Sequence, residues 1–300
     1  MLKKYYLIFN PKARQIPKDT SDFLQTFKEY DIHIEDIFEL GDPVKLRQQL
    51  SRIDSKSSII LVASGDGGVS SVIDYFTYSE VVVGIIPMGT ANSFARSLGI
   101  PLELNDALKV IKDNHFTKID LGKIGDDYFA NTANLGISAL INQSVNDDAK
   151  GIFGRGAYLI SAIYHLITAK SFDLVITSEN KIKKVFRGVE LLIANGKYQG
   201  GINLAPNASL KSSQINLRII KSSFMSKYKL MIFWLGRIFG QNWFEDIIVD
   251  LEGTSFFIET VPNLQVDIDG ESSIKTPFEI SIAAKAINII IQKNDPTKNQ

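Results

Sequence analysis

IILVASGDGG (residues 59–68) and VVVGIIPMGTANSFARSLG (residues 81–99) are the stretches that decide the fold of this chain. Each opens with an apolar run rich in β-branched residues and without alternation, Ile59–Ala63 and Val81–Ile86. Each run leads into a glycine-containing turn and then into a helical pattern. Such runs are typical of strands covered on both faces, as in a parallel sheet. The two stretches therefore predict an α/β domain.

The turns that follow the two strands have the composition of a phosphate site. Ser64–Gly68 holds three glycines, which allow positive φ and a close approach of a ligand to the main chain. The helix that follows turns free N–H groups and a positive dipole end toward the same place. Pro87–Asn92 is a second glycine-containing turn, which follows the next predicted strand and precedes another helical pattern. Glycine turns occur in any α/β sheet, but two in tandem, one of them with an Asp between glycines, favour binding of nucleotide phosphates.

The two motifs, SGDGG followed by PMGTANSFARSLGIP, resemble the paired signature of the diacylglycerol kinase catalytic family, which includes bacterial lipid kinases and sphingosine kinases. Neither matches the GxxxxGK[ST] phosphate loop or the GxGxxG dinucleotide fingerprint. NTANLGISA (131–139), GRGAYL (154–159) and ANGKYQGGINLAPNA (194–208) extend the resemblance over essentially the whole chain. It implies an ATP- and Mg²⁺-dependent lipid kinase with the NAD kinase/diacylglycerol kinase-like fold.

The fold class predicted on these grounds is α/β plus β. An N-terminal doubly wound α/β nucleotide-binding domain is expected over residues 1–122, and a β-sandwich-like lipid-substrate domain over 123–292. The end of the second domain is expected to pack back on the first, and 293–300 to form a polar tail. After helical patterns at 140–149 and 156–169, many short strands with turns at Asn195-Gly196 and Asp269-Gly270 favour a sandwich. Separate strands are predicted at 183–188 and 190–194, and at 278–282 and 286–291.

Composition limits the partners. Thirty-three basic and 33 acidic residues balance to zero formal charge, so no nucleic-acid partner is expected. The absence of cysteine excludes disulfides and thiolate metal sites. No apolar run approaches the about 20 residues of a membrane span, which favours a cytoplasmic protein. A homodimer through strand edges is left open, because a sequence does not say which edges are exposed.

Phosphoryl transfer needs a phosphate cradle, a metal that bridges oxygens and a carboxylate that takes the proton of the acceptor. Asp66 is the natural metal-linked carboxylate, through Mg-ATP; the alternative is a turn residue that caps its own helix. Thr90 and Asn92 are expected to donate to phosphate oxygens, to cap the following helix, or both. The resemblance adds the Asn-Pro at Asn10, beside the nucleotide. The residues predicted to bind the nucleotide are Asn10, Ser64, Gly65, Asp66, Gly67, Gly68, Gly89, Thr90 and Asn92.

The carboxylate base is harder to find from the residues alone. Asp269-Gly270 is an ordinary hairpin turn, and Glu271 after it would be a solvated charge. The resemblance implies otherwise, because the family has a DGE motif near the end of its second domain, whose glutamate is the proposed base for the lipid hydroxyl. On this match Glu271 is the base. Asp120 matches a family aspartate near that glutamate; a strand-edge Asp is the alternative.

Two departures from the family pattern stand out. Where the family carries an Asp-Gly pair after AP-x-A, whose Asp holds a structural magnesium, this chain has Ser212 and Ser213. A hydroxyl is a much poorer ligand for a hard cation, so that metal site is in doubt. The first glycine of the family's GGDG is Ser64, a smaller change.

Basic and apolar segments are the candidates for contact with phosphates and with lipid. Lys12 or Arg14 would steady the phosphates. The segment 224–239, which is aromatic with flanking basic residues, is either an interfacial helix or one packed on a core. The loop 142–155 is a candidate lipid mouth. The lipid substrate would be met at a membrane surface, with peripheral association. Two alternatives stay open: an NAD-kinase-like small-molecule kinase, and a nucleotide- or lipid-binding protein without turnover.

Overall fold

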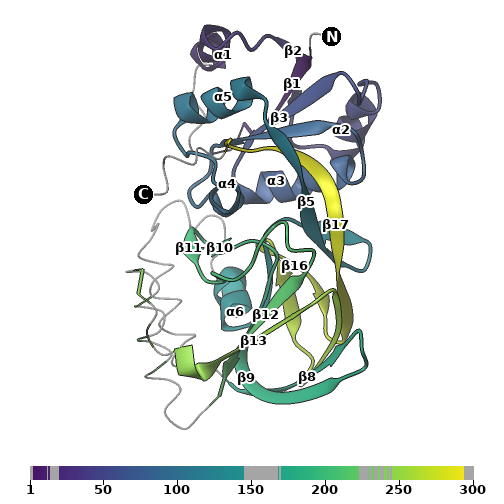
Figure 1. Ribbon diagram of the computed structural model, residues 1–300, viewed down its shortest axis with the longest axis vertical. Helices are drawn as coiled ribbons and strands as arrows, with labels where there is room; N and C mark the ends of the chain where they lie inside the picture. Colours follow the sequence, from purple (N-terminus) through teal and green to yellow (C-terminus); the bar gives the residue numbers. More distant parts are fainter. Residues whose placement is uncertain are drawn as a thin grey trace. The chain divides into compact units, whose positions relative to one another are not determined.

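The structure is a computed structural model that describes residues 3–11, 13, 20–144, 168, 170–222, 229, 232, 236, 240, 241, 243 and 245–293, with main chain alone at 20, 141–144, 245 and 271–273. The chain divides into two compact units (Figure 1). The first comprises Met1–Leu121 with Ala283–Gln300, and the second comprises Gly122–Ile282. Each unit is described by itself below.

The first unit is built on a parallel sheet in the order β17-β4-β3-β1-β2. Its strands are β1 (Lys4–Phe9), β2 (Ile34–Glu39), β3 (Ser58–Ser64), β4 (Val82–Pro87) and the last part of β17 (Phe278–Ile290). The register pairs Ser64 with Pro87, so β3 and β4 end level with each other. This brings the two glycine turns of the sequence to one edge of the sheet.

Helices cover both faces of this sheet, as a doubly wound domain requires. They are α1 (Thr20–Glu29), α2 (Pro43–Leu50), α3 (Asp66–Ile73), the 3₁₀ turn η1 (Asp74–Phe76), α4 (Ser93–Leu98) and α5 (Leu104–Asp113). Phe23 and Phe27 of α1 pack with Leu108 of α5 against one face. Asp42 is the N-cap of α2 and Pro43 lies in its first turn, the arrangement that an Asp-Pro pair indicates for the start of a helix.

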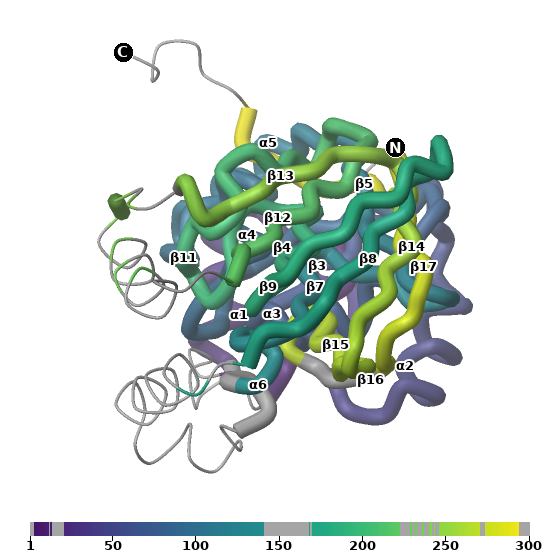
Figure 2. Tube along the Cα trace, turned by 90° about the horizontal axis from the view of Figure 1, so that it is seen from below, coloured from purple at the N-terminus to yellow at the C-terminus, as the bar shows by residue number. Residues whose placement is uncertain are grey.

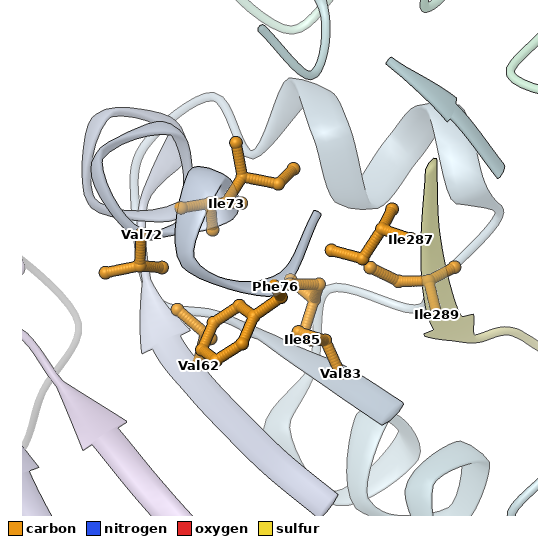
Figure 3. Close-up of a pocket in the computed structure, with 9 residues that line it drawn as sticks. Val62, Val72, Ile73, Phe76, Val83, Ile85, Ile287 and Ile289 are labelled. Carbon is orange, nitrogen blue, oxygen red and sulfur yellow. The ribbon is translucent and has the colours of Figure 1, made fainter. Parts of the chain in front are cut away.

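The opposite face of the sheet is closed by α3 and η1. Figure 3 shows the small cavity between them and the strands, with Val72, Ile73 and Phe76 facing Val62 and Ile85. The lining is Val62, Val69, Val72, Ile73, Phe76, Val83, Ile85, Ile287 and Ile289. Every one of these side chains is apolar, so the cavity belongs to the core and offers nothing that would hold a nucleotide.

The second unit is built mainly from antiparallel strands. Figure 2 shows β9, β8, β14 and β17 side by side. Its strands are the end of β5 (Phe116–Ile124), β6 (Asp127–Phe129), β7 (Thr132–Gly136), β8 (Phe172–Ser178), β9 (Lys183–Ala194), β10 (Tyr198–Gln199), β11 (Ile202–Asn203), β12 (Ile215–Lys221), β13 (Ile248–Gly253), β14 (Ser255–Val261), β15 (Gln265–Ile268), β16 (Glu271–Lys275) and the start of β17. The helix α6 (Ile137–Ser144) and the 3₁₀ turn η2 (Glu245–Ile247) complete it. An apolar core of inward-facing residues such as Leu174, Leu191 and Ile258 fills the unit.

In two places, two consecutive strands predicted from the sequence form one continuous strand in the structure. The break expected near Gly188 is wrong: this glycine stays within β9, where a Cβ would lie 3.3 Å from the Ile220 carbonyl oxygen of β12. Glycine marks a close approach of two strands there, not a turn. The break expected between 282 and 286 is also absent, because β17 continues through Lys285, although that residue has φ 53°.

Some predictions fall beyond the described part of the chain. The helix expected at 140–149 begins earlier, at Ile137, and is described through Ser144. Outside the described residues lie the helix expected at 156–169 apart from residue 168, the loop 142–155 from residue 145 onward, most of the segment 224–239, and both Lys12 and Arg14.

Candidate functional site

The two glycine turns of the first unit touch through their main chains. A Cβ on Gly89 would lie 2.5 Å from the Gly65 Cα, and a Cβ on Gly65 would lie 3.0 Å from the Gly89 Cα. The Met88 N–H donates to the Ser64 carbonyl at 3.0 Å, which extends the ladder of β3 and β4 past the strand ends. Only glycine leaves room for this approach at both positions. The two sequence motifs are therefore parts of one structure.

Asp66 joins the two turns through its side chain. Its Oδ1 accepts a hydrogen bond from the Phe94 N–H at 3.0 Å. Phe94 lies in the first turn of α4, so the carboxylate caps that helix and the alternative of a cap on its own helix α3 is wrong. Asp66 is partly exposed, and among the described residues its second oxygen has no hydrogen-bond partner. That oxygen is available to a ligand.

Asn92 closes the second turn on itself. Its Oδ1 accepts from the Gly89 N–H at 2.8 Å, and its Nδ2 donates to the Gly89 carbonyl at 2.9 Å. Asn92 has φ 49° and is the N-cap residue of α4 by position, but its side chain makes no capping bond. The expected side-chain cap is therefore wrong. Its amide sets the Gly89 peptide, while Thr90 is exposed.

Ser64 and Gly68 depend on each other. Ser64 is 2% exposed and its hydroxyl has no hydrogen-bond partner in the described structure. A Cβ on Gly68 would overlap the Ser64 Oγ, so a side chain at residue 68 and a serine at 64 exclude each other. A Cβ on Gly67 would meet no atom within 4 Å. Asn10 lies at the same sheet edge, where its N–H donates to the Ala63 carbonyl at 3.2 Å.

The two metal predictions differ in how well the residues fit a cation. Asp66 offers one oxygen beside the first-turn N–H groups of α3, which fits magnesium that is held mainly by nucleotide phosphates. At the second-domain position, the Ser212 Oγ instead donates to the Ser209 carbonyl at 3.0 Å and accepts from the Gln214 N–H at 3.3 Å. No carboxylate lies between residues 209 and 214, so this loop does not fit a hard cation. Within the described residues, no group of three or more His, Cys, Asp or Glu side chains could hold a metal ion.

Asp120 is a buried residue of the first unit. It is 1% exposed, and its Oδ1 accepts from the Lys285 N–H at 2.8 Å. This bond supports the left-handed conformation of Lys285 inside β17. The observed contact is structural, and the part of Asp120 in a reaction stays a prediction.

In the second unit, the Asp-Gly-Glu motif forms the hairpin that its sequence predicts. Ile268 of β15 pairs with Glu271 of β16, so the loop has two residues. Asp269 has φ 47° and Gly270 has φ 97°. Positive φ at both central positions is the signature of a type I′ turn, which Asp-Gly favours. Glu271 is thus the first residue after a tightly defined turn.

The side chain of Asp269 binds the main chain of a bend between β6 and β7. Its Oδ2 accepts from the Ala130 N–H at 2.9 Å, and its Oδ1 accepts from the N–H groups of Asn131 and Thr132 at 3.2 and 3.0 Å. The Asp269 N–H donates to the Thr132 carbonyl at 2.9 Å. Successive N–H groups that converge on one anion form a nest. The anion here is the protein's own carboxylate.

The carbonyl side of the same bend is held by the Asn195-Gly196 turn. The buried Asn195 donates through Nδ2 to the Ala130 carbonyl at 2.9 Å. The N–H groups of Asn195 and Gly196 both donate to the Asn131 carbonyl at 2.9 Å. Three separate stretches of sequence, NTAN, ANG and DGE, therefore meet in one hydrogen-bond network.

Comparison with known proteins decides the family. Residues 4–124 match the family model of the diacylglycerol kinase catalytic domain, and residues 131–291 match the YegS C-terminal NAD kinase beta sandwich-like domain. A diacylglycerol kinase of Staphylococcus haemolyticus is 30% identical over 241 residues, which are 79% of this chain and 72% of that protein. This chain belongs to the diacylglycerol kinase catalytic family. The predicted family and fold class are confirmed.

Solved structures agree with this assignment. A diacylglycerol kinase from Bacillus anthracis superposes with a TM-score of 0.74 at 25% identity, covering 97% of each chain. An NAD kinase from Archaeoglobus fulgidus in complex with ATP has a TM-score of 0.50 at 10% identity over 96% of this chain and 94% of that one. The second likeness concerns the fold alone. As a member of the family, the chain is a kinase.

One buried acid of this kinase escaped the sequence analysis. Glu190 of β9 is 2% exposed, and its Oε2 accepts from the Ser138 N–H at 2.9 Å, at the start of α6. Burial raises the pKa of Glu190 from 4.5 to about 7, and the negative charge of Asp267 acts in the same direction. The sequence held a signal, because a glutamate inside the apolar run VELLIA must face a partner if the strand is buried.

No helix in the described portion of this kinase has the length and apolar character needed to cross a membrane.

Proposed function

We propose that this chain is an ATP- and Mg²⁺-dependent lipid kinase that transfers the γ-phosphate of ATP to a hydroxyl of a diacylglycerol-like or sphingoid lipid. The observation that carries the proposal is the junction of the two glycine turns, with Gly65 against Gly89 and Asp66 bridging to α4. Main-chain N–H groups at the start of α3 and an available carboxylate oxygen are what a metal-bound triphosphate requires. The names of the relatives support a lipid as the acceptor.

Each residue has a defined task in this proposal. The first-turn N–H groups of α3 and the turn at Gly89 would bind the phosphates, and Asp66 would hold the cation of Mg-ATP. Magnesium, when bound with ATP, would neutralise charge on the phosphate oxygens. Glu271 takes the proton of the lipid hydroxyl as that oxygen forms a bond to the γ-phosphorus and the bond from this phosphorus to the leaving ADP oxygen breaks. The lipid is reached by peripheral contact with a membrane surface.

The test is phosphate transfer from radiolabelled ATP to a panel of acceptors under one set of conditions. Diacylglycerol, a sphingoid base and monoacylglycerol are presented in mixed micelles, and NAD is presented in solution, each with magnesium titrated. We expect label in one of the lipids and none in NAD. Label in NAD alone would replace the proposal with an NAD-kinase-like activity. ATP binding without any labelled acceptor would point to a binding protein without turnover.

A further inference from the structure

The carboxylate of Asp269 does more than its turn requires. A type I′ turn needs residues that tolerate positive φ, and asparagine or glycine serve as well as aspartate at this position. The three hydrogen bonds to Ala130, Asn131 and Thr132 need an acceptor with two oxygens, which only a carboxylate supplies without placing a donor against a donor. The choice of aspartate at 269 is therefore explained by the bend and not by the turn.

The N–H and carbonyl groups of the bend are bound by two other turns of the chain. Residues 130 and 131 lie between β6 and β7 and belong to neither strand. Their N–H groups bind Asp269, and their carbonyls bind Asn195 and Gly196. A buried main-chain group that lost its partner would be costly. Both sides of the bend are thus satisfied by two small turns, each more than 60 residues away in the sequence.

The same contacts fix the hairpin to the strand beside it. The β15–β7 ladder pairs Asp267 with Asn134 and Ile268 with Ala133. The Asp269 N–H extends this ladder by one more bond to Thr132, and the Gly270 N–H donates to the Asp267 Oδ1 at 3.0 Å. The main chain is therefore fastened at every residue up to the one that precedes Glu271.

We propose that Asp269 is a positioning residue for the phosphoryl transfer: by binding the N–H groups of residues 130–132, it fixes the main chain from which the Glu271 side chain extends. The inference rests on the proposed function, in which Glu271 is the base. Both oxygens of Asp269 are engaged by main-chain N–H donors, so its proposed role is to hold the turn. Displacement of a catalytic group by about 1 Å can cost about 100-fold in rate, so a fixed turn has a measurable value.

The test is a graded series at one position. Asp269→Gly keeps the positive φ and removes all three bonds; Asp269→Asn keeps an Oδ1 for Asn131 and Thr132 and sets an NH₂ against the Ala130 N–H. Asp126→Asn is the matched control, an exposed aspartate in the turn between β5 and β6 of the same unit. Lipid phosphorylation gives kcat, equilibrium titration gives the affinity for ATP, and hydrogen exchange follows the amides of 130–132 and 270–272.

We expect kcat to fall about 10- to 100-fold in Asp269→Gly and less in Asp269→Asn, with ATP affinity within about twofold of wild type. Amide exchange should quicken at 130–132 and at 270–272 in the same order, and Asp126→Asn should change neither quantity. Because glycine at position 269 also destabilises the turn, Asn195→Ala serves as a second variant. It removes the hydrogen bond to the Ala130 carbonyl and so loosens the bend from its carbonyl side. It should lower kcat in the same way.

Normal kcat in Asp269→Gly with faster exchange at 130–132 would overturn the inference, because the bend would then have no bearing on the base. A fall in ATP affinity equal to the fall in kcat would also overturn it, as the effect would be general. Failure of the proposed function looks different: wild type and Asp126→Asn would both label no lipid. In that case the rate of amide hydrogen exchange at 270–272 tests the positioning role, and an unchanged rate in Asp269→Gly would refute it.

Discussion

The two units fix their key turns in opposite ways. In the first unit, Gly65 and Gly89 meet main chain to main chain, and the absence of side chains creates the site. In the second unit, the bend at 130–132 is held by the side chains of Asp269 and Asn195, which occupy its N–H and C=O groups. A nest of N–H groups left open can bind a foreign anion, whereas a nest filled by the protein's own carboxylate cannot. On the proposed function, the first unit binds the phosphates and the second holds the main chain that precedes Glu271.

The largest effect that would sharpen this comparison is expected at Asp66. Asp66→Asn keeps an oxygen to accept from the Phe94 N–H, so stability should stay within about 0.5 kcal/mol of wild type. The lost charge should lower lipid phosphorylation by about 100-fold or more and weaken the dependence on magnesium. Steady-state assays with thermal unfolding separate the two roles. Full activity with lowered stability would mean that Asp66 is a helix cap only.

The next largest effect is expected from disrupting the contact between Gly65 and Gly89. Gly89→Ala would force a methyl group against the Gly65 Cα and should destabilise the protein by about 3 kcal/mol and abolish tight ATP binding. Gly41→Ala is the matched control, since its Cβ would meet no atom within 4 Å and Gly41 is not one of the residues predicted to bind the nucleotide. Chemical denaturation and ATP titration of both variants measure this. Equal behaviour of the two variants would show that the turns do not depend on their contact.

A smaller effect is expected from the buried acid of the second unit. Because the pKa of Glu190 is raised to about 7, the folded state holds the proton more tightly than the unfolded state. Its contribution to stability is therefore complete below about pH 4.5 and is lost as the pH rises through about 7. Glu190→Gln removes this titration, so the variant should gain about 2 kcal/mol relative to wild type between pH 5 and pH 8. Denaturation at both pH values tests the sign, with the exposed Glu279→Gln as control. A constant difference would show that Glu190 does not titrate in this range.

The smallest effect is expected at an ordinary cap. The Asp42 Oδ1 accepts from the N–H groups of Val44 and Lys45 at 2.9 and 3.2 Å. Asp42→Ala should cost about 1 kcal/mol of stability and leave ATP affinity unchanged. It sets the baseline for a first-unit side chain that has no part in the phosphate site. A loss of ATP binding in this variant would mean that the turns are sensitive to any loosening of the unit.

The sequence allowed the fold to be predicted where a pattern is local. Unalternated apolar runs indicated β3 and β4, the Asp-Pro pair indicated the start of α2, and Asp-Gly indicated the β15–β16 hairpin. The prediction failed where a residue's role depends on a distant strand. A glycine is typical of a break between two strands, but Gly188 lies inside β9, where β12 approaches it closely.

The residues of the candidate site were predicted from the sequence, but the hydrogen bonds and contacts between them were not. The glycine turns were expected to bind nucleotide phosphates, but their direct contact and the capping of α4 by Asp66 depend on the level ends of β3 and β4. Asp269 and Asn195 were noted only as turn residues, since their partners at 130–132 are more than 60 residues away. Long-range hydrogen bonds of this kind leave no trace in local composition.

The most direct test of the account uses Glu271→Gln, with ATP affinity and phosphate transfer to lipid measured on the same preparation. We expect ATP affinity within about twofold of wild type and a loss of transfer of about 100- to 10,000-fold, because Glu271 is the proposed base and belongs to a different unit from the glycine turns that are proposed to bind ATP. Transfer at the wild-type rate would contradict it, and the second unit would then supply no base.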